Sequence, residues 1–171
     1  MKKVTIILTG VILMTIAALN VNAQVTAYAE TSATIYTPIA ITKTVDMNFG
    51  NVAVSPTIPG TVILAPAGTR TLTGGVTLPA VTGTVTAADF TVTGEGTSTF
   101  SILIAPAEIT LSNGSSTMTV DSFNSTPTPT GALVGGTASV KVGGTLNVNA
   151  AQAGGLYTNE GDLLSVTVNY N

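Results

Sequence analysis

The 171-residue sequence contains no histidine and no cysteine. Without histidine, the chain lacks the usual general base near neutral pH and the commonest metal ligand. Without cysteine, it can form no disulfide, no thiolate nucleophile and no sulfur-ligated structural zinc site. A serine–histidine–aspartate triad is therefore excluded. We expect a protein that is not an enzyme, with no catalytic residue, no metal ligand and no cofactor.

Charged residues are also scarce, with five lysines and arginines and eight aspartates and glutamates. Only Lys43, Arg70 and Lys141 are basic beyond residue 23. Binding to nucleic acid needs clustered basic side chains, so no nucleic-acid partner is expected. The one close acidic pair, Glu160 and Asp162, lies in a glycine-containing turn, where such residues are common for conformational reasons alone.

Long apolar runs are absent except at the N-terminus, where Lys2 and Lys3 precede the uncharged run Val4–Leu19. Small residues in Val21–Ala23 then resemble a signal-peptidase site. The pattern predicts a signal peptide over residues 1–23 and a single exported domain over residues 24–171. We expect no transmembrane anchor, and a location in the periplasm, at the cell surface or outside the cell.

The remaining sequence is rich in valine, isoleucine and threonine, whose branched side chains favour pleated sheets. Strand-like runs alternate with turn signals roughly every 8–12 residues, which is typical of an all-β antiparallel sandwich. Residues Ser112–Ser115 mark the clearest hairpin, and Gly74-Gly75 predicts another tight one. Residues Asn124–Gly136 are expected to form a loop.

Alternation of apolar and polar residues predicts which side chains form the core. The predicted core comprises Ile39, Ile41, Phe49, Val62, Leu64, Val76, Phe90, Val92, Phe100, Ile102, Leu111, Met118, Val120, Val140, Val142, Leu146, Val148, Leu164, Val166 and Val168.

The clearest alternation occupies the last nine residues. Leu164, Val166, Val168 and Tyr170 share one face, and polar residues separate them. This period of two predicts a half-buried strand that is docked in a sheet. A weaker alternation places Val25, Ala27 and Ala29 on one face near the predicted mature N-terminus.

Several motifs resemble the bacterial domain-of-unknown-function 4402 family. Residues Thr37–Gly50 resemble its opening motif, Gly68–Val76 and Phe90–Gly94 its middle, and Gly143–Leu146 and Val166–Asn171 its end. The family is similar in pattern to spore coat protein U-like proteins and chaperone–usher pilin subunits. The resemblance implies an immunoglobulin-like, pilin-like sandwich.

The pilin likeness implies a fimbria-like structural or adhesive subunit at the cell surface, which assembles by β-strand donation. Its partners would be other protein subunits, either copies of itself or chaperone-like proteins. Leu164, Val166, Val168 and Tyr170 would belong to the assembly surface, and Val25, Ala27 and Ala29 to the donated strand.

The alternative is a self-complete, monomeric periplasmic or extracellular binding module, with the loop Asn124–Gly136 shaping its site. Tyr28 and Tyr36 are aromatic residues of the kind that stack on sugars, but strand propensity is the better explanation for them.

Overall fold

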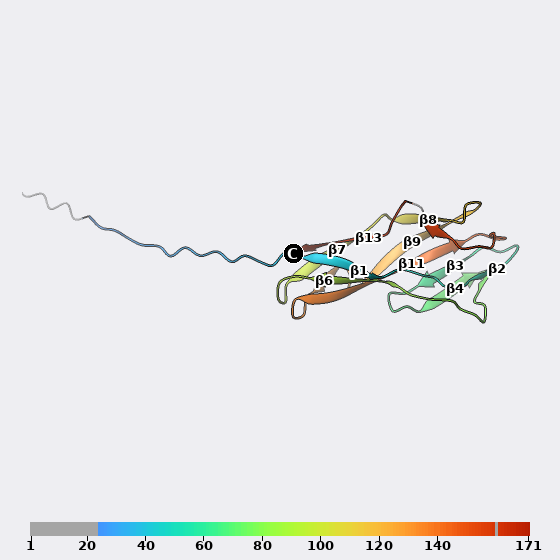
Figure 1. The fold of residues 1–171 in the computed structure, drawn as a ribbon, viewed down its shortest axis with the longest axis horizontal. Coiled ribbons are helices and arrows are strands. Elements are labelled where there is room, and N and C mark those ends of the chain that lie inside the picture. The colour runs from blue at the N-terminus through green and yellow to red at the C-terminus, as the bar shows by residue number, and fades with distance from the viewer. Residues whose placement is uncertain (1–23, 160) are drawn as a thin grey trace, which may run out of the picture. The chain divides into compact units, whose positions relative to one another are not determined.

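The computed structural model describes residues 24–159 and 161–171. The predicted signal peptide lies outside the described residues. The chain divides into two compact units, residues 1–34 and residues 35–171. In the first unit, residues 24–34 form no strand, and every one of them is exposed. The second unit contains every strand found in residues 24–159 and 161–171 (Figure 1).

The larger sheet of the second unit is antiparallel. Its strands follow the order β1-β6-β11-β9-β8-β12, and β3 adds to β11 while β4 adds to β3. The strands are β1 (Ala40–Val45), β3 (Gly60–Leu64), β4 (Arg70–Gly74), β6 (Ala88–Thr93), β8 (Glu108–Ser112), β9 (Thr117–Thr126), β11 (Thr137–Val148) and β12 (Thr158–Asn159).

Strand β11 organises this sheet, because its twelve residues pair with three partners. Along one edge it pairs first with β6 and then with β3, and along the other edge it pairs with β9. The strand continues through Gly143-Gly144 without a turn. A Cβ atom on Gly143 would lie 2.1 Å from the main-chain oxygen of Leu64, so the absent side chain allows β3 to approach.

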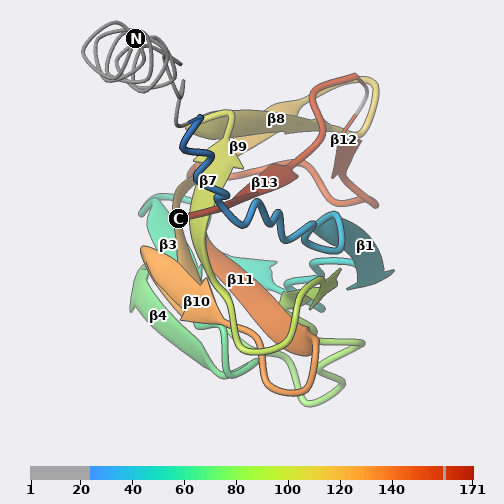
Figure 2. The ribbon, with the colours of Figure 1, turned by 90° about the vertical axis from the view of Figure 1, so that its left-hand side faces the viewer.

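A three-stranded antiparallel sheet packs against the first. Its order is β10-β7-β13, from Thr130–Ala132, Thr99–Ala105 and Ser165–Tyr170. Figure 2 shows β13 beside β7, and the two strands pair along the whole length of β13. The strands β2 (Ala53–Val54) and β5 (Val76–Thr77) form a separate pair. The predicted all-β antiparallel sandwich is therefore confirmed, as two facing sheets in a curled arrangement.

The predicted hairpins have different outcomes. The hairpin of β8 and β9 is confirmed, and the Asn113 side chain accepts hydrogen bonds from the Ser115 and Ser116 amides in its turn. The Gly74-Gly75 hairpin is wrong, since β4 pairs with β3 and β5 pairs with β2. The expected loop Asn124–Gly136 is also wrong, because it contains the end of β9 and all of β10.

The core forms two clusters of buried side chains. One cluster, centred on Phe90, Phe100 and Val140, lies between the two sheets. The other, centred on Phe49, Leu64 and Leu146, lies on the larger sheet near β3. Most predicted core residues are buried, and the pattern missed Ala88, Ile109 and Leu133. The predicted core residues that stay only half-buried are Ile39, Ile41, Ile102, Leu111, Met118 and Leu164.

Candidate functional site

Several strands of the second unit lie at sheet edges with a single partner among the described residues, and two of them, β1 and β13, come close together. Strand β13 pairs only with β7, at one edge of the small sheet, and β1 pairs only with β6, at one edge of the large sheet. The two strands lie next to each other without forming a ladder. Each edge therefore presents main-chain N–H and C=O groups that an added strand could pair with.

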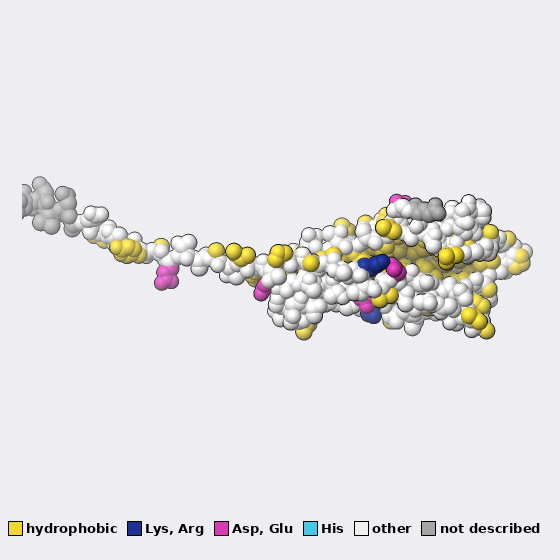
Figure 3. All heavy atoms as spheres, viewed as in Figure 1, with side chains coloured by type: hydrophobic (Ala, Val, Ile, Leu, Met, Phe, Trp, Pro, Cys, Tyr) yellow, Lys and Arg dark blue, Asp and Glu magenta, His cyan; other side chains and the backbone are white. Residues whose placement is uncertain are grey.

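An apolar groove of about 850 Å³ opens where β1 ends and just before β13 begins. Its lining includes Lys43 near the end of β1, which forms an ion pair with Asp46 just after that strand, and Leu163 and Leu164, which lead into β13. Figure 3 shows hydrophobic side chains exposed along this hollow. The floor comes from the inward faces of both core clusters and includes Phe49, Phe90, Ile109, Val120, Leu146 and Val148.

The groove explains why part of the predicted core remains accessible. Three residues that alternation assigned to the core, Leu111, Met118 and Leu164, are only half-buried. All three line the groove. Met47 and Phe123, which the sequence pattern did not single out, line it as well. The inward face of the large sheet thus extends beyond the area that the three-stranded sheet covers.

The predicted assembly residues of the C-terminal strand have different environments. Val166 and Val168 are buried in the core beneath β13, Leu164 lines the groove, and Tyr170 is half-buried at the end of the strand. Val25, Ala27 and Ala29 are exposed in residues 24–34, so the structure leaves their pairing untested.

Tyr170 holds the beginning of the second unit in place. Its hydroxyl donates a hydrogen bond to the Thr37 carbonyl (2.7 Å) and accepts one from the Glu95 amide (2.6 Å). The Glu95 carboxylate accepts hydrogen bonds from the Thr37 hydroxyl and amide. The ring of Tyr36 packs edge-on against Tyr170, with 6.3 Å between centroids. We call Tyr36, Thr37, Glu95 and Tyr170 the clasp.

No pattern in the sequence indicates that Thr37 and Glu95 belong to this cluster. Gly94 supports the arrangement, because a Cβ atom there would lie 2.3 Å from the Tyr170 hydroxyl. Hydrogen bonds from the Thr37 hydroxyl and then its amide lower the pKa of Glu95 below its ordinary value. Since the ionised carboxylate is favoured, the clasp is complete near neutral pH and weakens as pH falls through that lowered pKa.

Replacing Tyr170 by phenylalanine should lower the free energy of unfolding by about 1–2 kcal/mol, because two hydrogen bonds are lost while the ring remains. Urea unfolding of the purified protein measures this change. Tyr28→Phe is the matched control, since Tyr28 is 94% exposed and should have no effect. Equal stability of both variants would contradict the clasp.

The remaining polar candidates are paired at the surface. The Lys141 ammonium nitrogen lies 3.3 Å from the Asp89 carboxylate, which also accepts a hydrogen bond from the Ser139 hydroxyl, and the Lys141 side chain is exposed. The Asn159 amide donates to the Asp162 carbonyl, and Glu160 lies outside the described residues. Within the described part of the chain, no three acidic residues gather closely enough to hold a metal ion.

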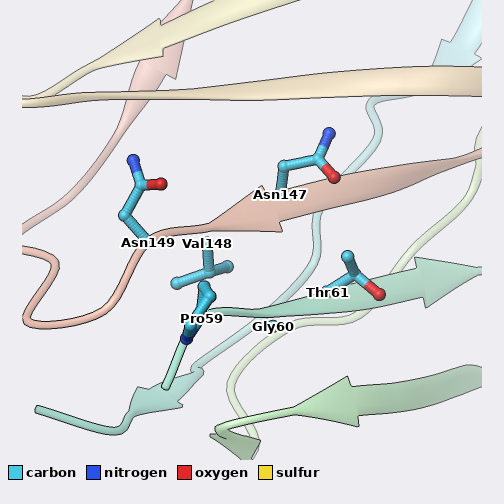
Figure 4. Close-up of a pocket in the computed structure, with 6 residues that line it drawn as sticks. All are labelled: Pro59, Gly60, Thr61, Asn147, Val148 and Asn149. Atoms are coloured by element: carbon cyan, nitrogen blue, oxygen red, sulfur yellow. The ribbon is translucent and has the colours of Figure 1, made fainter. Parts of the chain in front are cut away.

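A second, smaller hollow of about 270 Å³ lies where β3 begins and β11 ends (Figure 4). It is lined by Pro59, Gly60, Thr61, Asn147, Val148 and Asn149. The Asn147 amide nitrogen already donates to Asp121 and Thr119 on β9. No titratable side chain lines this hollow, so the larger groove is the stronger candidate site.

Taken together, the fold and the groove define an all-β antiparallel sandwich with an apolar hollow near the end of β1 and the start of β13. The chain belongs to the family described as domain of unknown function DUF4402, whose model matches residues 39–170. No curated protein and no solved structure matches the sequence. Across residues 24–159 and 161–171, the structure contains no helix with the length and apolarity needed to cross a membrane.

Proposed function

We propose that the protein is an exported, non-enzymatic structural subunit of the bacterial cell surface, and that its groove accepts an extended strand from another protein subunit. The single observation that carries this proposal is the apolar groove at the end of β1 and the start of β13, two strands that each have an unpaired edge. The absence of histidine and cysteine from the sequence supports a non-enzymatic role.

A polypeptide strand suits this site better than a small molecule. The edge of β13 offers main-chain donors and acceptors, which an added strand can satisfy along its whole length. At the same time, the half-buried Leu111, Met118 and Leu164 would be covered by alternate side chains of that strand. Main-chain hydrogen bonds would supply affinity and the apolar floor would select side chains.

The resemblance to chaperone–usher pilins agrees with this proposal in the C-terminal strand. The alternating Leu164, Val166 and Val168 and the penultimate aromatic Tyr170 follow the pilin pattern. The chain departs from that pattern by having no cysteine, and because Gly161 lies nearer the last strand than the pilin glycine does.

A matched pair of leucines tests the proposed function. Leu163 is 68% exposed and lines the groove, whereas Leu103 is 64% exposed and lies outside it on β7. Leu163→Asp should abolish assembly, since a carboxylate is disfavoured in an apolar site from which water is excluded. Leu103→Asp should assemble like the wild type, and both variants should keep their melting temperatures.

Light scattering after gel filtration measures assembly, using protein purified from the extracytoplasmic fraction of the host. An intact mass that begins at Gln24 checks the proposed export in the same material, and a product that retains Met1 would contradict it. A wild-type protein that stays monomeric at every concentration, alone and with its host proteins, would favour the alternative function, a self-complete binding module.

A further inference from the structure

We infer that Asn113 is a site of self-modification, at which the main-chain nitrogen of Gly114 attacks the Asn113 side chain and converts it to aspartate and isoaspartate. The inference does not depend on the proposed function. Asn113 is the only asparagine in the sequence that a glycine follows directly, and glycine has no side chain to hinder the approach of its nitrogen. The hydrogen bonds of the turn between β8 and β9 carry the inference further, because they engage both reacting groups.

The Asn113 side-chain oxygen is surrounded by hydrogen-bond donors. Oδ1 accepts hydrogen bonds from the Ser116 amide (2.8 Å), the Ser115 amide (3.0 Å) and the Ser115 hydroxyl (3.1 Å). Main-chain N–H groups only donate, so the atom that they contact is the oxygen and not the amide nitrogen. Attack on Cγ places negative charge on this oxygen. Donors that are already held there lower the barrier, as they do in an oxyanion hole.

The attacking nitrogen also has a partner in the turn. The Gly114 N–H donates a hydrogen bond to the Ser112 hydroxyl oxygen (2.9 Å), which can pass the proton on to solvent. Gly114 is exposed, and no atom lies within 4 Å of a Cβ built there. Water therefore has access to the turn, both to take up this proton and to complete the reaction.

Water is the only co-reactant that the reaction needs. The bond between the Gly114 nitrogen and Asn113 Cγ forms, and the Gly114 proton leaves through the Ser112 hydroxyl to solvent. The bond between Cγ and Nδ2 breaks, and Nδ2 takes a proton from water and leaves as ammonia, so a cyclic imide remains. Water then opens the imide at Cγ to give aspartate, or at the Asn113 main-chain carbonyl carbon to give isoaspartate.

The reaction changes a contact next to the groove. A Cβ atom on Gly155 would lie 3.2 Å from Nδ2 of Asn113, and Gly155 lines the groove. Conversion replaces this amide nitrogen by a carboxylate oxygen in aspartate. In isoaspartate, it also adds a methylene group to the main chain of the turn.

Comparing folded with unfolded protein tests the inference. Full-length protein is incubated at mildly alkaline pH with and without guanidinium chloride, and peptide mapping by mass spectrometry measures aspartate and isoaspartate at residue 113. We expect conversion to be about tenfold faster or more in the folded protein, because only the folded turn holds the donors at Oδ1. Asn124 is the internal control. It precedes Ser125, which is buried in the ladder of β9 and β11, so Asn124 should convert more slowly in the folded protein.

A matched pair of serines shows whether the donors cause the acceleration. Ser115→Ala removes the hydroxyl donor and should slow conversion in the folded protein about tenfold, whereas Ser116→Ala keeps its main-chain donor and should convert like the wild type. Circular dichroism checks that both variants are folded. The inference is overturned if wild-type Asn113 converts no faster when folded than when unfolded, or if the two folded variants convert at equal rates.

Discussion

Deleting Leu164–Asn171 should abolish the cooperative unfolding transition of the domain. Val166 and Val168 are buried, and burying each such side chain contributes about 1.5–3 kcal/mol. The deletion also removes the ladder with β7 and the clasp at Tyr170. A domain of this size has a total stability of only about 5–15 kcal/mol, so these combined losses exceed what the remaining fold can sustain.

Circular dichroism during heating measures this result. A pair of point variants shows whether the loss of stability comes from lost burial of side chains or from shortening the chain. Val168→Asp should also unfold the domain, whereas Asn169→Asp should leave the melting temperature nearly unchanged, since Asn169 is exposed. A cooperative transition in the truncated protein would show that β13 is not part of the folded core.

Gly143→Ala should destabilise the domain by about 3 kcal/mol, the upper end of the usual cost of forcing extra atoms into a packed site. The new Cβ atom would lie 2.1 Å from the main-chain oxygen of Leu64. That oxygen belongs to β3, which is hydrogen-bonded to β11 at the neighbouring position, so neither strand can move without breaking the ladder.

Gly154→Ala is the matched control, because no atom lies within 4 Å of a Cβ built there. Chemical denaturation of both variants measures the difference in free energy of unfolding. Equal stabilities would mean that β3 and β11 do not approach as closely at Gly143 as the structure places them.

Local alternation predicted those features that depend on one strand or on two adjacent ones. One example is β13, where a period of two shows which side chains of Ser165–Tyr170 face the core. Another is the hairpin of β8 and β9, whose turn residues determine how the two strands pair. Pairing between distant strands left no local pattern. Gly74 and Gly75 therefore suggested a hairpin, although β4 and β5 each pair with another strand.

In the candidate site, too, local features could be predicted from the sequence and contacts between distant residues could not. Leu164, Val166 and Val168 could be assigned to one face from the sequence, but alternation does not reveal what covers that face. Leu111 and Met118 were expected in the core, and the structure leaves them half-buried because the small sheet ends short of them. The contact of Glu95 with Thr37 joins residues far apart in the chain, so no spacing could indicate it.

Amide hydrogen exchange along β13 tests the central claim most directly. In the monomeric Leu163→Asp variant, the alternate amides of Ser165–Tyr170 that point away from β7 have no ladder partner and should exchange quickly. In the assembled wild-type protein, these same amides should become as protected as those bonded to β7, because an added strand accepts their hydrogen bonds. If they keep exchanging at the monomer rate while the protein is assembled, no strand has paired with β13.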